Sequence, residues 1–222
     1  MTLVHDAHET QATHATHASM AALEGRYSAP AGHHPPSTIG VDNRKLLMWL
    51  FLASDCMFFG SLIGTFLVYR GRSLVGPTAI EIWDIPYTSV SAFVLLMSSL
   101  TMVLAVSAAA QNDDRRTTLW LSVTALLGST FVGGQVYEFT SFYREGLGFT
   151  TSLFGSSFYT LTGFHGVHAT VGIIMLMALV GIISRSKVPG QKAEVVELVG
   201  LYWHFVDIVW IIIFTLVYLI PS

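Results

Sequence analysis

Charged side chains are scarce in this chain, since Asp, Glu, Lys and Arg make up only 11% of its 222 residues. Soluble domains typically carry about a quarter. The net charge of −3, without any Lys/Arg-rich run, argues against a nucleic-acid partner. The single cysteine, Cys56, excludes an intramolecular disulfide and any metal or iron–sulfur site built from cysteine alone. Period-two alternation is also missing, which argues against membrane-spanning strands.

Long apolar runs are what the chain has instead, and 52% of its residues are apolar. Five runs stand out, at about 46–69, 89–110, 118–141, 155–184 and 198–220. About 20 helical residues cross the roughly 30 Å hydrocarbon layer, so each run is long enough. Because lipid offers no hydrogen bonds to the backbone, these spans must be helices. The sequence therefore predicts an all-α integral membrane domain of five transmembrane helices over residues 44–222.

The connections between the runs carry the expected breaks. Gly76-Pro77 and Pro86 are assigned to the loop between the first two spans. The polar stretch 111–116, Gln-Asn-Asp-Asp-Arg-Arg, predicts a tight turn between spans two and three. Residues 184–192, with Pro189-Gly190, link the last two spans.

Residues 1–43 differ in composition and predict a mostly disordered tail rich in His and Ala, without the apolar core of a cleaved signal peptide. Six of the nine histidines lie in this tail: His5, His8, His14, His17, His33 and His34. A solvated low-complexity arm is the favoured interpretation, because the spacing of these histidines does not define a set of metal ligands. A metal-binding arm is the alternative.

The distribution of Lys and Arg predicts the orientation. Eight flank the N-terminal side of the spans: Arg26, Arg44, Lys45, Arg115, Arg116, Arg185, Lys187 and Lys192. Three flank the other side: Arg70, Arg72 and Arg144. The positive-inside rule then places the N-terminus in the cytoplasm and the C-terminus in the periplasm.

A few polar side chains interrupt the apolar spans, where a charge costs at least about 2.5 kcal/mol unless it is paired or hydrated. They are Asp55, Gln135, Glu138, His165, His168, His204 and Asp207. Those that share a span lie three residues apart and hence on one helix face. Their depths predict an inner cluster of Asp55, His204 and Asp207, and an outer cluster of Gln135, Glu138, His165 and His168.

Three interpretations of these residues compete. Haem ligation by His165, His168 and His204 is disfavoured, because two histidines on one face of one helix cannot both bind a single iron. An autonomous proton or ion transporter is the alternative function, although the sequence shows no repeated half and no pair of proline-broken helices. The third interpretation, polar contacts that join helices and fix their register, carries the most weight for each residue alone.

Two stretches carry a specific family resemblance. Residues 155–168 read Gly-Ser-Ser-Phe-Tyr-Thr-Leu-Thr-Gly-Phe-His-Gly-Val-His, and residues 202–210 read Tyr-Trp-His-Phe-Val-Asp-Ile-Val-Trp. With the Gln135-x-x-Glu138-aromatic step and Glu197, they resemble subunit III of the haem–copper terminal oxidases, in its five-helix bacterial form. The resemblance covers about residues 44–222. One departure is Asp55, which stands where the family usually has a glutamate.

The resemblance implies a subunit without haem, copper or any other redox centre of its own. It implies a direct contact with catalytic subunit I, which holds the haems and a copper, in a complex with subunit II and further subunits. It also implies helices splayed around a phospholipid-binding cleft, a stabilising role and support of proton uptake, in the bacterial plasma membrane. Arg44, Lys45 and Arg185 are the lipid-binding candidates. The electron donor, cytochrome c or quinol, stays open.

Overall fold

The structure is a computed structural model that describes residues 43–70, 85–185 and 192–220. The chain forms two units, residues 1–46 and 47–222, and the helix bundle belongs to the second. The predicted tail over 1–43 and the links at 71–84 and 186–191 fall almost wholly outside the described residues.

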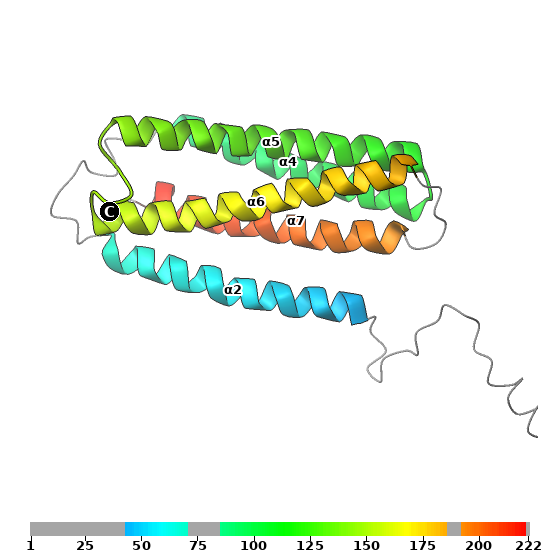
Figure 1. The fold of residues 1–222 in the computed structure, drawn as a ribbon, viewed down its shortest axis with the longest axis horizontal. Helices are drawn as coiled ribbons and strands as arrows, with labels where there is room; N and C mark the ends of the chain where they lie inside the picture. Colours follow the sequence, from blue (N-terminus) through cyan, green and yellow to red (C-terminus); the bar gives the residue numbers. More distant parts are fainter. Residues whose placement is uncertain (1–42, 71–84, 186–191, 221–222) are drawn as a thin grey trace, which may run out of the picture. The chain divides into compact units, whose positions relative to one another are not determined.

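The described residues form five long helices and no strand (Figure 1). They are α2 (Asn43–Tyr69), α4 (Ile85–Ala110), α5 (Asp114–Arg144), α6 (Leu153–Arg185) and α7 (Lys192–Phe214). A short π-helical segment, η1 (Thr215–Leu219), continues α7. All five helices are long and apolar enough to cross a membrane. The predicted class and number of spans are therefore confirmed for the described residues, and this is a multi-pass membrane protein.

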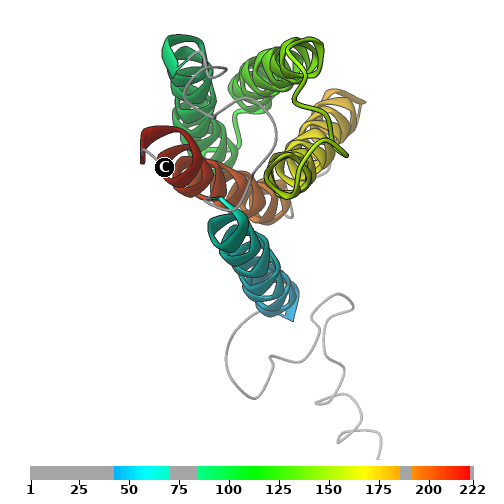
Figure 2. The same ribbon diagram turned by 90° about the vertical axis from the view of Figure 1, so that its left-hand side faces the viewer.

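The helices α4, α5, α6 and α7 surround a common interior, as the end-on view in Figure 2 shows. Helix α7 is the most covered, with 56% of its most apolar stretch buried, whereas α2 has only 17%. Residues 47–69 of α2 lie outside the four-helix group and contact α6 and α7 through aromatic pairs such as Phe58–Phe164 and Phe51–Tyr202. The wide apolar surface left uncovered suits a lipid environment and would be untenable in water.

The core is organised around Trp203 of α7, which is fully buried. Two glycines make room for its ring: a Cβ added at Gly128 of α5 would lie 2.5 Å from the ring, and one at Gly172 of α6 would lie 2.8 Å from it. The indole N–H donates a 2.9 Å hydrogen bond to Ser98 Oγ of α4. One side chain thus contacts the three neighbouring helices of the group.

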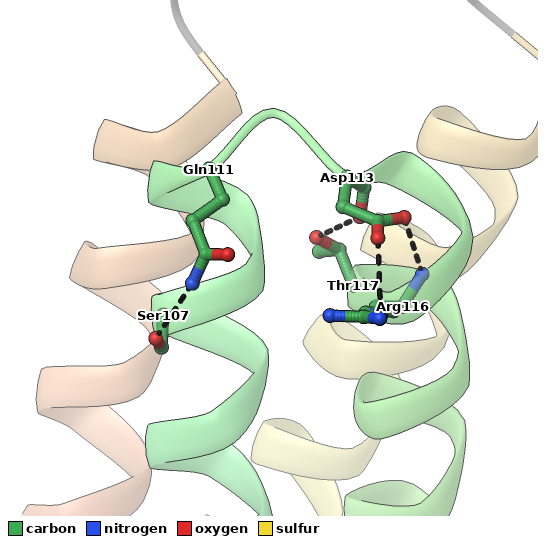
Figure 3. Close-up of polar contacts among 5 residues, drawn as sticks. All are labelled: Ser107, Gln111, Asp113, Arg116 and Thr117. Atoms are coloured by element: carbon green, nitrogen blue, oxygen red, sulfur yellow. Dashed lines mark hydrogen bonds and ion pairs between the residues drawn. The ribbon is translucent and has the colours of Figure 1, made fainter.

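The turn between α4 and α5 is as tight as its sequence predicts (Figure 3). Asn112 adopts a positive φ of 57°, a conformation that asparagine tolerates well. Asp113 caps α5, since its carboxylate accepts the Arg116 backbone N–H at 3.0 Å and faces the Arg116 guanidinium at 3.2 Å. The polar side chains satisfy backbone groups that a helix end leaves open.

Pro86 is a correction to the sequence analysis, which assigned it to a loop. It is the second residue of α4, in the first helical turn. A proline is accommodated there because the first backbone N–H groups of a helix have no intrahelical acceptor to lose.

Arg70 follows the last residue of α2 and contacts η1 and the residue after it. Its guanidinium donates to the backbone carbonyls of Leu216, at 2.6 Å, and Ile220. These are carbonyls at the C-terminal end of a helix, which lack partners of their own. Arg70 thus joins the ends of α2 and η1.

Candidate functional site: polar contacts between the helices

Asp55 of α2 lies next to His168 of α6. The carboxylate Oδ2 is 3.7 Å from His168 Nε2, within reach of an ion pair but too long for a hydrogen bond. Tyr202 of α7 donates its phenolic O–H to the His168 backbone carbonyl at 3.0 Å. The Phe59 ring covers the imidazole edge, with ring centroids 5.0 Å apart. The contact thereby ties peripheral α2 to α6 and α7, with 12% and 19% of the Asp55 and His168 side chains exposed.

His204 and Asp207 of α7 both face Ser99 of α4. The Ser99 hydroxyl lies 2.5 Å from His204 Nδ1, which makes a short hydrogen bond. The same hydroxyl interacts with the Asp207 carboxyl. Within the described residues, however, neither Asp207 oxygen lies in strict hydrogen-bonding geometry with a donor. Asp207 is only 3% exposed.

Glu138 of α5 is buried and bonds across to α4. The Thr88 hydroxyl donates to its carboxylate at 2.7 Å, and the Tyr218 phenol of η1 bonds to the same carboxylate. A carboxylate that accepts several hydrogen bonds is far less costly in an apolar interior than an isolated one. Glu138 thus joins α5 to α4 and to η1.

Gln135, one turn before Glu138, faces α6 instead. Its amide Nε2 donates a long hydrogen bond, 3.4 Å, to the Thr162 backbone carbonyl. Its Oε1 lies 2.8 Å from the position that a Cβ on Gly166 would occupy. The missing side chain at Gly166 therefore allows Gln135 to lie against the α6 backbone.

His165 of α6 is completely buried. Its Nε2 lies 3.2 Å from the Val206 carbonyl of α7, and because a carbonyl only accepts, this nitrogen carries the proton. The imidazole packs at a centroid distance of 4.8 Å against Trp210, which in turn packs against Phe131 at 4.8 Å. His165 thus anchors α6 to the α7 backbone inside an aromatic group.

The predicted inner cluster of Asp55, His204 and Asp207 is wrong. Asp55 pairs with His168, whereas His204 and Asp207 face Ser99 on α4. Similar depth was the basis for grouping them, but α2 and α4 contact α7 on different faces. The members predicted for an outer cluster bond to separate groups on separate helices.

Sequence reasoning missed the hydroxyl partners. Thr88, Ser99 and Tyr218 each contact a predicted polar residue. Ser, Thr and Tyr are common in membrane helices and most bond to their own backbone, so nothing in the pattern marks these three. Within the described residues, no group of three His, Cys, Asp or Glu side chains comes together in a way that could hold a metal ion.

The lipid-binding candidates lie at helix ends. Arg44 and Lys45 are in the first turn of α2, and Arg185 is the last residue of α6. A separate apolar groove of about 280 Å³ runs between α5 and α6, and at Gly163 nothing would lie within 4 Å of an added Cβ.

Comparison with known proteins identifies the family. A sequence model described as cytochrome c oxidase subunit III matches residues 22–222. The match begins earlier than residue 44, so the likeness extends further into the N-terminal region than the motifs indicate.

Individual relatives carry the names of the same family. Cytochrome c oxidase subunit 3 of Bacillus sp. (strain PS3) is 38% identical over 86% of this chain and 92% of its own length. Cytochrome bo(3) ubiquinol oxidase subunit 3 of Pseudomonas aeruginosa is also 38% identical, over 78% of this chain and 83% of its own. A probable quinol oxidase subunit 3 of Staphylococcus saprophyticus is 36% identical over 79% of this chain and 88% of its own length. The equal identity to the first two means that similarity does not separate the electron donors. With the five spans and the matched length, these likenesses show that the chain belongs to the cytochrome c oxidase subunit III family.

Proposed function

We propose that this chain binds catalytic subunit I of a proton-pumping haem–copper oxidase directly in a bacterial plasma membrane, stabilises it, and supports proton uptake without a redox centre of its own. The observation that carries the proposal is the set of buried polar contacts, each of which joins different helices inside an apolar bundle. Such contacts fix the relative positions of helices in a membrane, where apolar packing alone specifies them poorly.

A partner is also favoured by polar groups that stay partly uncovered in the spans. Asp55, His168 and His204 retain some exposure in the isolated chain. Ionisable groups facing hydrocarbon are costly, and burial against a protein surface with polar groups removes that cost. A neighbouring subunit supplies such a surface, whereas lipid tails do not.

Purification tests the proposal. We expect an affinity-tagged chain, extracted in a mild detergent, to retain partner subunits whose reduced-minus-oxidised spectrum shows haem. A similarly tagged, unrelated multi-span protein from the same cells is the control. A chain that migrates alone and conducts protons or ions in liposomes would instead establish the transporter alternative.

The orientation is tested with single cysteines. In a Cys56→Ser background, Asn112→Cys marks the α4–α5 turn and Glu145→Cys marks the end of α5, both at exposed positions. With the C-terminus in the periplasm, a membrane-impermeant maleimide labels only the Glu145 variant in intact cells. Labelling of the Asn112 variant alone would reverse the proposed orientation.

Bound phospholipid is part of the proposal. Arg44, Lys45 and Arg185 are cations at helix ends, where headgroup phosphates lie. Native mass spectrometry of the purified complex should show phospholipid retained on the subunit, and Arg185→Gln should reduce it. Arg144→Gln, on the opposite side of the membrane, is the control.

A further inference from the structure

Asp207 has an unusual position among the buried polar residues. Its carboxyl lies in the interior of the four-helix group without a strict hydrogen-bond donor among the described residues. The two tryptophans that flank it on α7 do not serve it: the Trp203 N–H bonds to Ser98, and the Trp210 N–H contacts no acceptor in the described residues. A carboxylate charge without a partner is disfavoured in such surroundings, which makes this carboxyl a proton-binding group rather than half of an ion pair.

The helices packed around Asp207 offer few titratable partners. Helix α4 contains no Asp, Glu, Lys, Arg or His. Four other acidic or histidine side chains in the spans contact other groups: Asp55, Glu138, His165 and His168. Glu197 is half-buried on α7 but lies about 15 Å along the helix from Asp207. His204 is therefore the titratable group that shares a contact with Asp207, and the shared contact is Ser99.

His204, Ser99 and Asp207 lead from the surface where α4 meets α7 into the interior of the bundle. Ser99 and His204 are half-buried where α4 meets α7, beside the exposed Leu100 and Ile208. The Ser99 hydroxyl is 2.5 Å from His204 Nδ1 and also interacts with Asp207, which is buried. Since Nδ1 of His204 bonds to Ser99, the second ring nitrogen, Nε2, is the one that can exchange a proton at the surface between α4 and α7.

We propose that His204, Ser99 and Asp207 form a proton relay, in which a proton taken up at His204 comes to rest on the buried Asp207 carboxyl. The relay rests on the proposed function, because it gives one site at which the subunit would handle protons.

Every proton is accounted for in the steps of the relay. With Asp207 ionised, the Ser99 hydroxyl donates to the carboxylate and His204 Nδ1–H donates to Ser99 Oγ. A proton donated by a polar group of the neighbouring subunit that covers this surface binds His204 Nε2, the Nδ1 proton passes to Ser99 Oγ, and the former hydroxyl proton passes to Asp207. Asp207 is then neutral, Ser99 donates to His204 Nδ1, and Nε2 keeps the new proton. Release runs the steps in reverse.

Infrared spectroscopy of the purified oxidase complex tests the relay. A protonated Asp207 gives a carbonyl stretching band that is present in the wild-type complex, absent after Asp207→Asn and shifted after Asp207→Glu. After transfer to D2O this band should shift as deuterium replaces the proton. Ser99→Ala should slow that shift by roughly a hundredfold, the contribution typical of a positioned proton-transfer group.

Another serine of α4 provides a matched control. Ser89 is half-buried and, within the described part of the chain, bonds only to its own helix, at 2.7 Å to the Ile85 carbonyl. Ser89→Ala should leave the exchange rate unchanged. Equal rates in the Ser99 and Ser89 variants, or no Asp207 band in an intact complex, would overturn the relay and leave the proposed function standing. A complex that lacks this chain would overturn the proposed function instead.

Discussion

The position of Trp203 between two glycines gives a stability prediction that can be worked out from distances. In Gly128→Ala, the new Cβ would lie 2.5 Å and 2.8 Å from two atoms of the indole ring. The ring also lies close to α6, because a Cβ at Gly172 would lie 2.8 Å from it. The Trp203 N–H bond to Ser98 holds the ring in its plane. The substitution must therefore displace a helix or the ring.

Overpacking of this kind costs about 1–3 kcal/mol, a change of roughly 5- to 150-fold in the folding equilibrium. Replacing a helical glycine by alanine gains up to about 1 kcal/mol where space allows. Gly181→Ala in α6 is the matched control, since nothing lies within 4 Å of its added Cβ. Denaturant unfolding of the purified protein in detergent should show Gly128→Ala destabilised and Gly181→Ala unchanged or more stable.

A double-mutant cycle tests the cause. Trp203→Phe removes the ring atoms nearest to Gly128, so Gly128→Ala should cost less in that background than in the wild type. Equal costs in the two backgrounds, or a Gly128→Ala variant as stable as Gly181→Ala, would refute the close packing of α5 on α7 at Trp203.

Three further substitutions test separate contacts. Thr88→Val removes the hydroxyl that donates to Glu138 and should cost about 1–3 kcal/mol in the same unfolding assay, with Thr118→Val, whose hydroxyl bonds only to its own helix, as the control. Asp55→Ala should leave the co-purified subunits in place but shorten the number of turnovers before the oxidase loses activity, and an unchanged turnover lifetime would contradict that role. Asp113→Ala removes the α5 cap and should destabilise the protein by about 1 kcal/mol, whereas Asp113→Ser should restore most of the loss.

The span count was predictable because lipid imposes a simple rule: a helix must be apolar for about 20 residues. The sequence also marked the turn at Asn112 and Asp113, where local polar chemistry decides the conformation. Pro86 shows the limit of local rules, since the same residue suits a loop or the first turn of a helix.

The polar contacts were only half predictable, and the reason is geometric. Spacing of three residues assigns His204 and Asp207 to one face of α7, and both do face Ser99. Spacing does not say which helix that face meets, and Asp55 was placed with them only because of its depth. The choice between neighbours is made by packing, above all by the Trp203 ring, which needs glycines on α5 and α6 and a hydroxyl on α4. The same packing that brings α4 against α7 brings Ser99 to His204, so a loosened Trp203 pocket should weaken the Ser99–His204 contact as well.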